Sequence, residues 1–221
     1  MKQYWWKIAA VFILYYVFYQ GFMGEVPRQP ILNETIRNLY FHVTMWFAMS
    51  LMLIFSVVYA VRYLRNGSPF HDDLSTEFAK SGILFGVLGC ATGSLWATYT
   101  WGDPWPNDPK LNSAAIGMLI YFAYLLLRSS FEDEQRRARI SAIYNIFAFS
   151  VFIPLIFIIP RLTDSLHPGN GGNPAFSSYD LDNKMRMVFY PAVIGWTLLG
   201  VWISTLRARL TRINRTLQER N

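Results

Sequence analysis

Six long stretches of this chain consist mostly of apolar residues, and this feature constrains the fold more than any other. They cover approximately residues 5–22, 40–61, 79–98, 113–127, 140–159 and 187–206. Crossing the hydrocarbon core of a bilayer, about 30 Å thick, takes about 20 apolar residues in a helix, because a helix satisfies its own backbone hydrogen bonds there. The sequence therefore predicts an all-α integral membrane protein, with one domain built as a bundle of six transmembrane helices.

The composition points the same way. Of the 221 residues, 53% are hydrophobic and only 15% are charged, which argues against an ordinary soluble domain. The first stretch has features of a signal peptide, because Lys2 and Lys7 accompany an apolar core. Residues 21–24 offer no small-x-small cleavage site, however, so we interpret this stretch as a retained membrane anchor.

The third stretch is rich in small residues, which let transmembrane helices approach each other closely. These residues are Gly82, Gly86, Gly89, Ala91 and Gly93. Cys90 lies among them and is the single cysteine of the chain, so it forms no internal disulfide. We interpret it as a small packing residue.

The distribution of basic residues predicts how the bundle sits in the membrane. Loops that face the cytoplasm are enriched in Lys and Arg, and most of the 20 such residues fall on one side, in the termini and in the loops after the second and fourth helices. We therefore expect both termini in the cytoplasm, with 207–221 as a basic tail that contacts anionic lipid or a cytoplasmic partner. The net charge of +6 is then an orientation signal and gives no support to nucleic-acid binding.

Two of the three histidines fall on the opposite, outer side. His42 lies at the outer end of the second helix, and His167 lies in the outer loop between the fifth and sixth helices. Neutral imidazole is a common metal ligand and the usual ligand of haem iron. A packing role for His42 or a polar loop role for His167 explains each one separately, but the pair on one side favours a haem site. His71, beside Asp72 and Asp73, is predicted to be a solvated surface residue in a cytoplasmic loop.

A tryptophan-bearing loop joins the third and fourth helices on that same outer side. Trp101 and Trp105 lie in it and Trp96 lies slightly deeper, so together they offer a stacking surface for a flat ring. An aromatic belt at the membrane interface explains the tryptophans as well, but not the prolines at 104, 106 and 109, which stiffen the loop. Arg37 and Lys110 are candidates for holding the anionic haem propionates. Zinc is disfavoured, because the histidines lack ligand spacing.

Several segments together resemble the haem-handling family of cytochrome c biogenesis, the CcmC, CcmF and CcsA proteins with a tryptophan-rich "WWD" loop. These segments are YFHVTMW at 40–46, GSLW at 93–96, WGDPWPNDPKL at 101–111, YFAYLLLR at 121–128 and SLHP at 165–168. The length and the six helices are similar to the haem exporter branch. The loop departs from the family pattern, because Asn107 replaces a tryptophan, Lys110 an arginine and Asn112 a threonine.

The resemblance implies a haem carrier in the bacterial inner membrane, with no catalytic role, whose haem b site faces the periplasm. It implies that His42 and His167 are the axial ligands of the iron and that the loop carries the haem. The loop residues concerned are Trp96, Trp101, Trp105 and Asp108. The implied partners are a haem chaperone of the CcmE type, ABC transporter subunits of the CcmA and CcmB type and a small CcmD-type subunit.

Two other functions stay open on the sequence alone. One is a membrane-anchor cytochrome b subunit of a respiratory enzyme, which usually places paired histidines deep within its helices. The other is a small-solute permease, which would bind no haem at all. No phosphate-binding loop and no nucleophile motif occurs in the sequence, which disfavours the common classes of hydrolase and nucleotidase.

Overall fold

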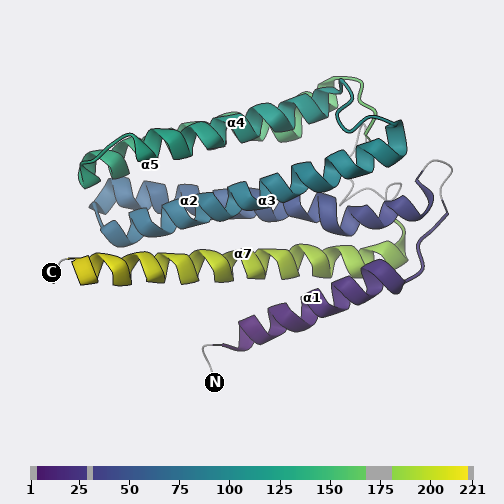
Figure 1. Ribbon diagram of the computed structural model, residues 1–221, viewed down its shortest axis with the longest axis horizontal. Coiled ribbons are helices and arrows are strands. Elements are labelled where there is room, and N and C mark those ends of the chain that lie inside the picture. The colour runs from purple at the N-terminus through teal and green to yellow at the C-terminus, as the bar shows by residue number, and fades with distance from the viewer. Residues whose placement is uncertain (1–3, 29–31, 168–180, 219–221) are drawn as a thin grey trace.

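The computed structural model describes residues 4–28, 32–167 and 181–218, and this part of the chain is helical without any strand (Figure 1). The helices are α1 (Trp5–Met23), the 3-10 helix η1 (Asn33–Asn38), α2 (Leu39–Asn66), α3 (Pro69–Trp101), α4 (Pro109–Ser129), α5 (Glu134–Ile153), the π-helix η2 (Pro154–Ile158), α6 (Ile159–Leu162) and α7 (Asn183–Gln218). Among the described residues, 6 helical spans are long and apolar enough to cross a membrane. The prediction of an all-helical protein with six such spans is confirmed.

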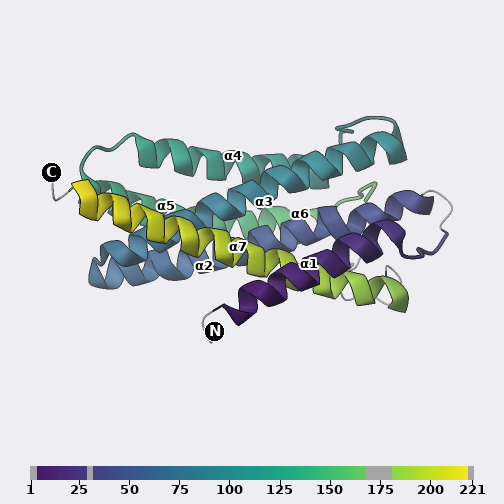
Figure 2. The ribbon, with the colours of Figure 1, turned by 60° about the horizontal axis from the view of Figure 1, so that its bottom comes forward.

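The antiparallel pair α2 and α3 forms the centre of the bundle (Figures 1 and 2). The α4–α5 hairpin packs on one side of this pair, and α7 packs on the other side with α1 against it. Both termini point toward one end of the bundle, and the α3–α4 loop and the segment after α6 lie at the other end. We call these the terminal end and the histidine end.

Two helices run further than the apolar stretches indicate. Helix α3 begins at Pro69 and continues through Trp101. His71 therefore lies in the first turn of a helix and not in a loop. Gly67 and Gly102 end α2 and α3 with φ angles of 65° and 79°, a left-handed conformation that favours glycine. Helix α7 continues to Gln218, which makes most of the basic tail helical.

The core between α2, α3 and their neighbours depends on the glycines of α3, as the sequence predicts. A Cβ atom on Gly82 would lie 2.8 Å from Leu53 Cδ2, and one on Gly89 would lie 3.0 Å from the ring of Trp46. The centre of the core is rich in methionine, with Met49, Met52 and Met118 almost fully buried. Flexible methionine side chains fill the irregular gaps that closely spaced helices leave.

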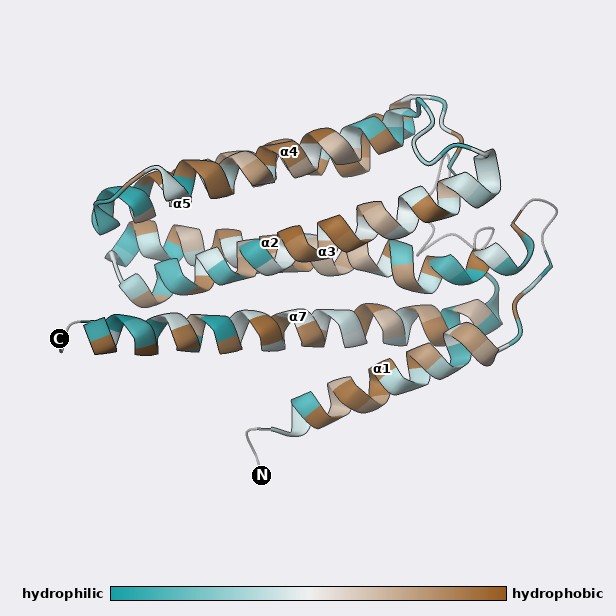
Figure 3. Ribbon diagram, in the orientation of Figure 1, coloured by the Kyte–Doolittle hydropathy of each residue, from teal (hydrophilic) through white to brown (hydrophobic). Residues whose placement is uncertain are grey.

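Ion pairs of buried acids tie the first turns of α3 to α4 and α7 at the terminal end, where the helix ends are hydrophilic (Figure 3). The three acids are at most 7% exposed. The pairs are Asp72 with Arg128 at 2.6 Å, Asp73 with Arg215 at 2.7 Å and Glu77 with Arg207 at 2.6 Å. Removing Arg128 or Arg215 would leave an uncompensated buried carboxylate, so these two pairs fix how the helices pack at this end, whereas Glu77 also pairs with Lys80 at 2.7 Å.

Candidate functional site

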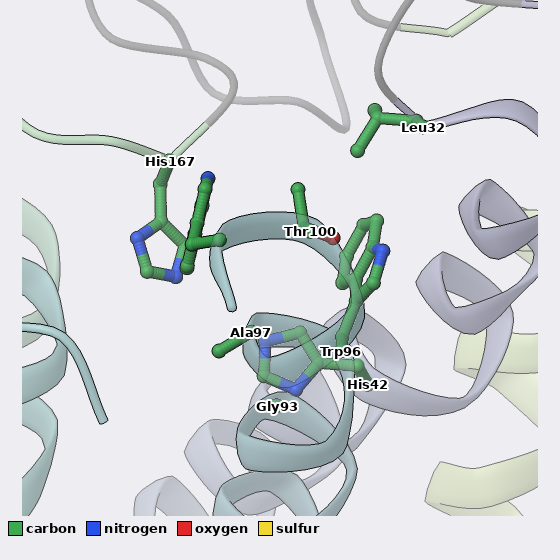
Figure 4. Close-up of a pocket in the computed structure, with 8 residues that line it drawn as sticks. Leu32, His42, Gly93, Trp96, Ala97, Thr100 and His167 are labelled. Atoms are coloured by element: carbon green, nitrogen blue, oxygen red, sulfur yellow. The ribbon is translucent and has the colours of Figure 1, made fainter. Parts of the chain in front are cut away.

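A small pocket opens at the histidine end, between the last turns of α3 and the segments that face them. Figure 4 shows His167 on one side of it and His42 with Trp96 on the other, and Ala97 and Thr100 of α3 also line it. The residues that line it are Leu32, His42, Gly93, Trp96, Ala97, Thr100, Trp101 and His167. Its volume is about 20 Å³, room for about one water molecule. The structure thus brings together both predicted histidines and two of the three predicted tryptophans.

His42 is held by the packing of α2 against α3. Its Nδ1 lies 2.9 Å from the carbonyl oxygen of Gly89, and since a carbonyl only accepts, Nδ1 carries the proton and donates it. The Nε2 atom then keeps its lone pair. Gly93 makes room for the ring, because a Cβ atom there would lie only 2.5 Å from His42 Cε1. A neutral imidazole with its Nδ1–H bound to a carbonyl is the usual state of a metal-binding histidine.

His167 lies in the segment that follows α6, outside any helix. The carboxylate of Asp108 holds its ring in position. Its Nδ1 lies 3.3 Å from Oδ1 of Asp108, and no other polar atom of the described residues pairs with this buried nitrogen. Burial lowers the pKa of His167 to about 4, with the charge of Lys110 acting in the same direction and Asp108 opposing it. The ring is therefore neutral at neutral pH, which is the form that binds a metal.

Asp108 is the residue that joins the α3–α4 loop to the His167 segment. It is 1% exposed and caps the N-terminus of α4, where Oδ1 accepts the Lys110 N–H at 2.8 Å. Its Oδ2 accepts the Ser165 hydroxyl at 2.8 Å and the Leu166 N–H at 2.7 Å. Burial alone would raise the pKa of this carboxyl, but the Leu166 and Ser165 hydrogen bonds and the nearby His167 hold it below its usual value.

Each histidine contacts one tryptophan of α3 edge to face. The rings of His42 and Trp96 are 5.9 Å apart at 74°, and those of His167 and Trp101 are 4.9 Å apart at 61°. Trp96 also donates its indole N–H to Thr35 at 3.1 Å, which fixes that ring. Because α3 extends through Trp101, the tryptophans that line the pocket belong to a helix, and the loop itself begins at Gly102.

Three other predicted site residues lie outside the pocket lining. Trp105 is 38% exposed, and its indole N–H lies 3.4 Å from Asn112 Oδ1. Arg37 donates to the carbonyl of Gly24 at 2.5 Å and pairs with Glu34. Lys110 lies in the first turn of α4 and acts electrostatically on both histidines. None of these three side chains therefore lines the pocket, although the charge of Lys110 reaches both histidines.

Sequence reasoning missed the glycines and the hydroxyl at the site itself. Gly89 and Gly93 stand out in the sequence only as members of a small-residue run, whereas the structure shows that they position the ring of His42. Thr100 lines the pocket with a buried hydroxyl that has no partner among the described residues. Such an unpaired polar group is costly to bury, and it marks a place where a ligand or water would bind.

The fold and site define a multi-pass helical membrane protein with two neutral imidazoles facing one pocket at one end of the bundle. The family model described as "CcmC: Heme exporter protein C" matches residues 1–221, and the chain belongs to that family. The described residues hold no cluster of three or more His, Cys, Asp or Glu that would bind a bare metal ion.

Relatives named "Heme exporter protein C" cover most of the chain. The protein of Bradyrhizobium diazoefficiens is 27% identical over 219 residues, which is 97% of this chain and 81% of that protein. The protein of Escherichia coli K12 is 23% identical over 212 residues, 93% of this chain and 81% of that protein. A "Cytochrome c biogenesis protein CcsA" of a Synechococcus species is 38% identical over 80 residues, 36% of this chain and 26% of that protein.

Proposed function

We propose that this protein carries haem for cytochrome c biogenesis, with His42 and His167 as the two axial ligands of the iron. One observation carries the proposal: imidazoles from segments far apart in the sequence line one pocket, each with its Nδ1 turned to a protein oxygen. This arrangement leaves both Nε2 atoms for iron. Two imidazoles saturate the iron, which suits carriage of haem better than oxygen chemistry.

The size of the pocket adds a condition to this proposal. A volume of about 20 Å³ accommodates about one water molecule, so a porphyrin enters only when the walls move apart. The His42 wall consists of α2 and α3, which pack along most of their length. The His167 wall is a segment outside the helices, attached through Asp108. We infer that the segment with His167 moves away from α3 when haem enters. Its contacts with Asp108 keep Ser165, Leu166 and His167 together during that movement.

The surrounding residues suggest separate roles in holding the haem. Trp96 and Trp101 offer ring surface beside the two imidazoles. Lys110 is the cation we assign to a propionate, because its charge already acts on both histidines. Arg37 is occupied by Glu34 and two backbone carbonyls, and we assign it to the connection between α1 and α2. Trp105, exposed on the loop, is better placed to contact a partner.

The relatives' names and the basic residues of the chain support a proposal for the wider setting. We propose that the histidine end faces the periplasm of a bacterial inner membrane, with both termini in the cytoplasm. Haem b held there is passed to a haem chaperone of the CcmE type. ABC transporter subunits of the CcmA and CcmB type and a CcmD-type subunit act in the same system.

Haem binding is tested by purifying the full chain in detergent and recording its absorption spectrum. We expect a Soret band in the wild type and none when His42 and His167 are both replaced by alanine. Delivery is tested separately in Escherichia coli that lacks its own haem exporter protein C, where the wild type should restore covalent haem staining of c-type cytochromes. A wild type without a Soret band, or a double variant with an unchanged one, would overturn the proposal.

A further inference from the structure

The last turns of α7 expose a row of apolar side chains that nothing in the described chain covers. The four residues are between 50% and 57% exposed, and they recur at helical spacing on one face. They are Leu206, Leu210, Ile213 and Leu217, which we call the α7 stripe. On the opposite face of the same turns, Ser204 and Ala208 are buried against the bundle. The stripe therefore points directly away from the rest of the protein.

The α7 stripe continues the face of α7 on which α1 packs. A Cβ atom on Gly195 would lie 2.9 Å from Leu14 of α1, and the rings of Trp202 and Trp6 are 6.4 Å apart. Trp202 and Leu206 are four residues apart and so share one face. Helix α1 begins at Trp5, whereas α7 runs on well beyond that point (Figure 1). The stripe is thus the uncovered part of a helix-packing surface.

Lipid does not account for this surface. Tyr4 and Trp5 are exposed at the start of α1, at the level of Trp202, and exposed aromatic rings of this kind mark the membrane interface. Leu217 lies about 22 Å further along the α7 axis, at a rise of about 1.5 Å per residue. The headgroup layer adds only about 5–8 Å to each side of the hydrocarbon core. The outer half of the stripe therefore stands in water unless a protein covers it.

The charges beside the stripe indicate what kind of protein fits. Arg209 is exposed on the flank of the stripe, and Arg212 is exposed further round the helix, with its guanidinium 4.9 Å over the Phe70 ring of α3. Among the described residues no carboxylate forms an ion pair with either arginine. The other arginines of this segment, Arg207 and Arg215, are already paired with Glu77 and Asp73 of α3. A second copy of this chain would bring more arginines to the same place, and like charges disfavour that contact.

We propose that the α7 stripe docks an amphipathic helix of a partner protein, with apolar residues facing Leu210, Ile213 and Leu217 and carboxylates facing Arg209 and Arg212. Helices bind grooves and helix faces in this way through anchors spaced three or four residues apart. The apolar row supplies the contact area, and the two arginines select an acidic partner and its register. The proposal does not depend on haem ligation, which involves the other end of the bundle.

The test is a photo-cross-link from the stripe in the membranes of the organism that encodes the protein. The full chain carries p-benzoylphenylalanine at Ile213, or at Leu119 on α4, whose side chain is 64% exposed in the membrane-spanning part. We expect a discrete protein cross-link from position 213 and none from position 119. Mass spectrometry of the cross-linked peptide should show apolar residues at helical spacing flanked by Asp or Glu.

Reversing the charges beside the stripe tests the proposal in a way that does not rely on cross-linking of an unidentified protein alone. Arg209→Glu with Arg212→Glu should lower the cross-link yield about tenfold, and changing the partner's carboxylates to lysine should restore it. Arg136→Glu with Arg139→Glu on α5 makes the same change in net charge on exposed residues of the same end and should leave the yield unchanged. Cross-links only to lipid or to a second copy, a peptide without carboxylates, or a yield indifferent to the Arg209 and Arg212 changes would overturn the proposal.

Discussion

The two histidines of the pocket are held in different ways. His42 stands on a helix, its ring bonded to the Gly89 carbonyl and pressed against Gly93 by the packing of α2 on α3. His167 stands outside the helices, and its ring is oriented by one buried carboxylate, Asp108. One side of the site therefore shares the rigidity of the bundle, and on the other side the described segment is attached mainly through the contacts of Asp108 with Ser165, Leu166 and His167. A carrier that must both hold and release its cargo benefits from such a difference.

The largest expected effect is a difference in haem retention between variants of the two histidines. His42→Ala should abolish haem retention during purification, because it removes the ligand that the bundle holds in place. His167→Ala should leave a weaker, five-coordinate complex, because His42 keeps its position. The haem-to-protein ratio after gel filtration measures both. Equal and complete loss in the two variants would contradict the proposed asymmetry.

A smaller effect is expected from the helix side of the site. Gly93→Ala places a methyl group 2.5 Å from His42 Cε1, so the ring must move and haem affinity should fall about 10- to 100-fold. Gly117→Ala on α4 is the matched control, since its Cβ atom would lie 3.3 Å from Phe152 and Gly117 does not line the pocket. Haem titration followed at the Soret band compares the two. Unchanged haem affinity in the Gly93 variant would show that the close contact of Gly93 with the ring does not position His42.

The loop side is tested at Asp108. Asp108→Asn keeps a side chain that caps α4 well but removes the charge beside His167, and we expect haem affinity to fall about tenfold. Asp133→Asn is the control, because Asp133 caps α5 at the terminal end of the bundle. Thermal unfolding of both variants in detergent should resemble that of the wild type. Wild-type haem affinity in Asp108→Asn would refute a positioning role for this carboxylate.

The smallest effect concerns the tryptophans. Trp101→Ala removes the ring beside His167 and should weaken haem binding by about 0.5–1.5 kcal/mol, the usual value of an aromatic contact. Trp105→Ala should leave haem affinity unchanged, because this ring lies outside the pocket lining. The two variants are compared in the same titration. Equal losses would show that the loop contributes to the stacking surface as much as the last turns of α3.

Much of the fold follows from the sequence, because the bilayer requires long apolar helices and the chain contains six of them. The start of α3 could not be predicted as well from the sequence. Its acids Asp72, Asp73 and Glu77 look like exposed loop charges until their arginine partners in α4 and α7 are known. The two histidines could be proposed from residue type and expected side. The roles of Gly93 and Asp108 could not, because they arise from contacts between segments distant in the sequence.

The central claim is that both imidazoles bind one iron, and electron paramagnetic resonance of the ferric, haem-loaded protein tests it most directly. Two imidazole ligands give a low-spin signal, so we predict this signal in the wild type and its replacement by a high-spin signal in His167→Ala. Added free imidazole should restore the low-spin signal in that variant by filling the vacated position. A high-spin wild type, or a low-spin signal that survives unchanged in His167→Ala, would contradict the account.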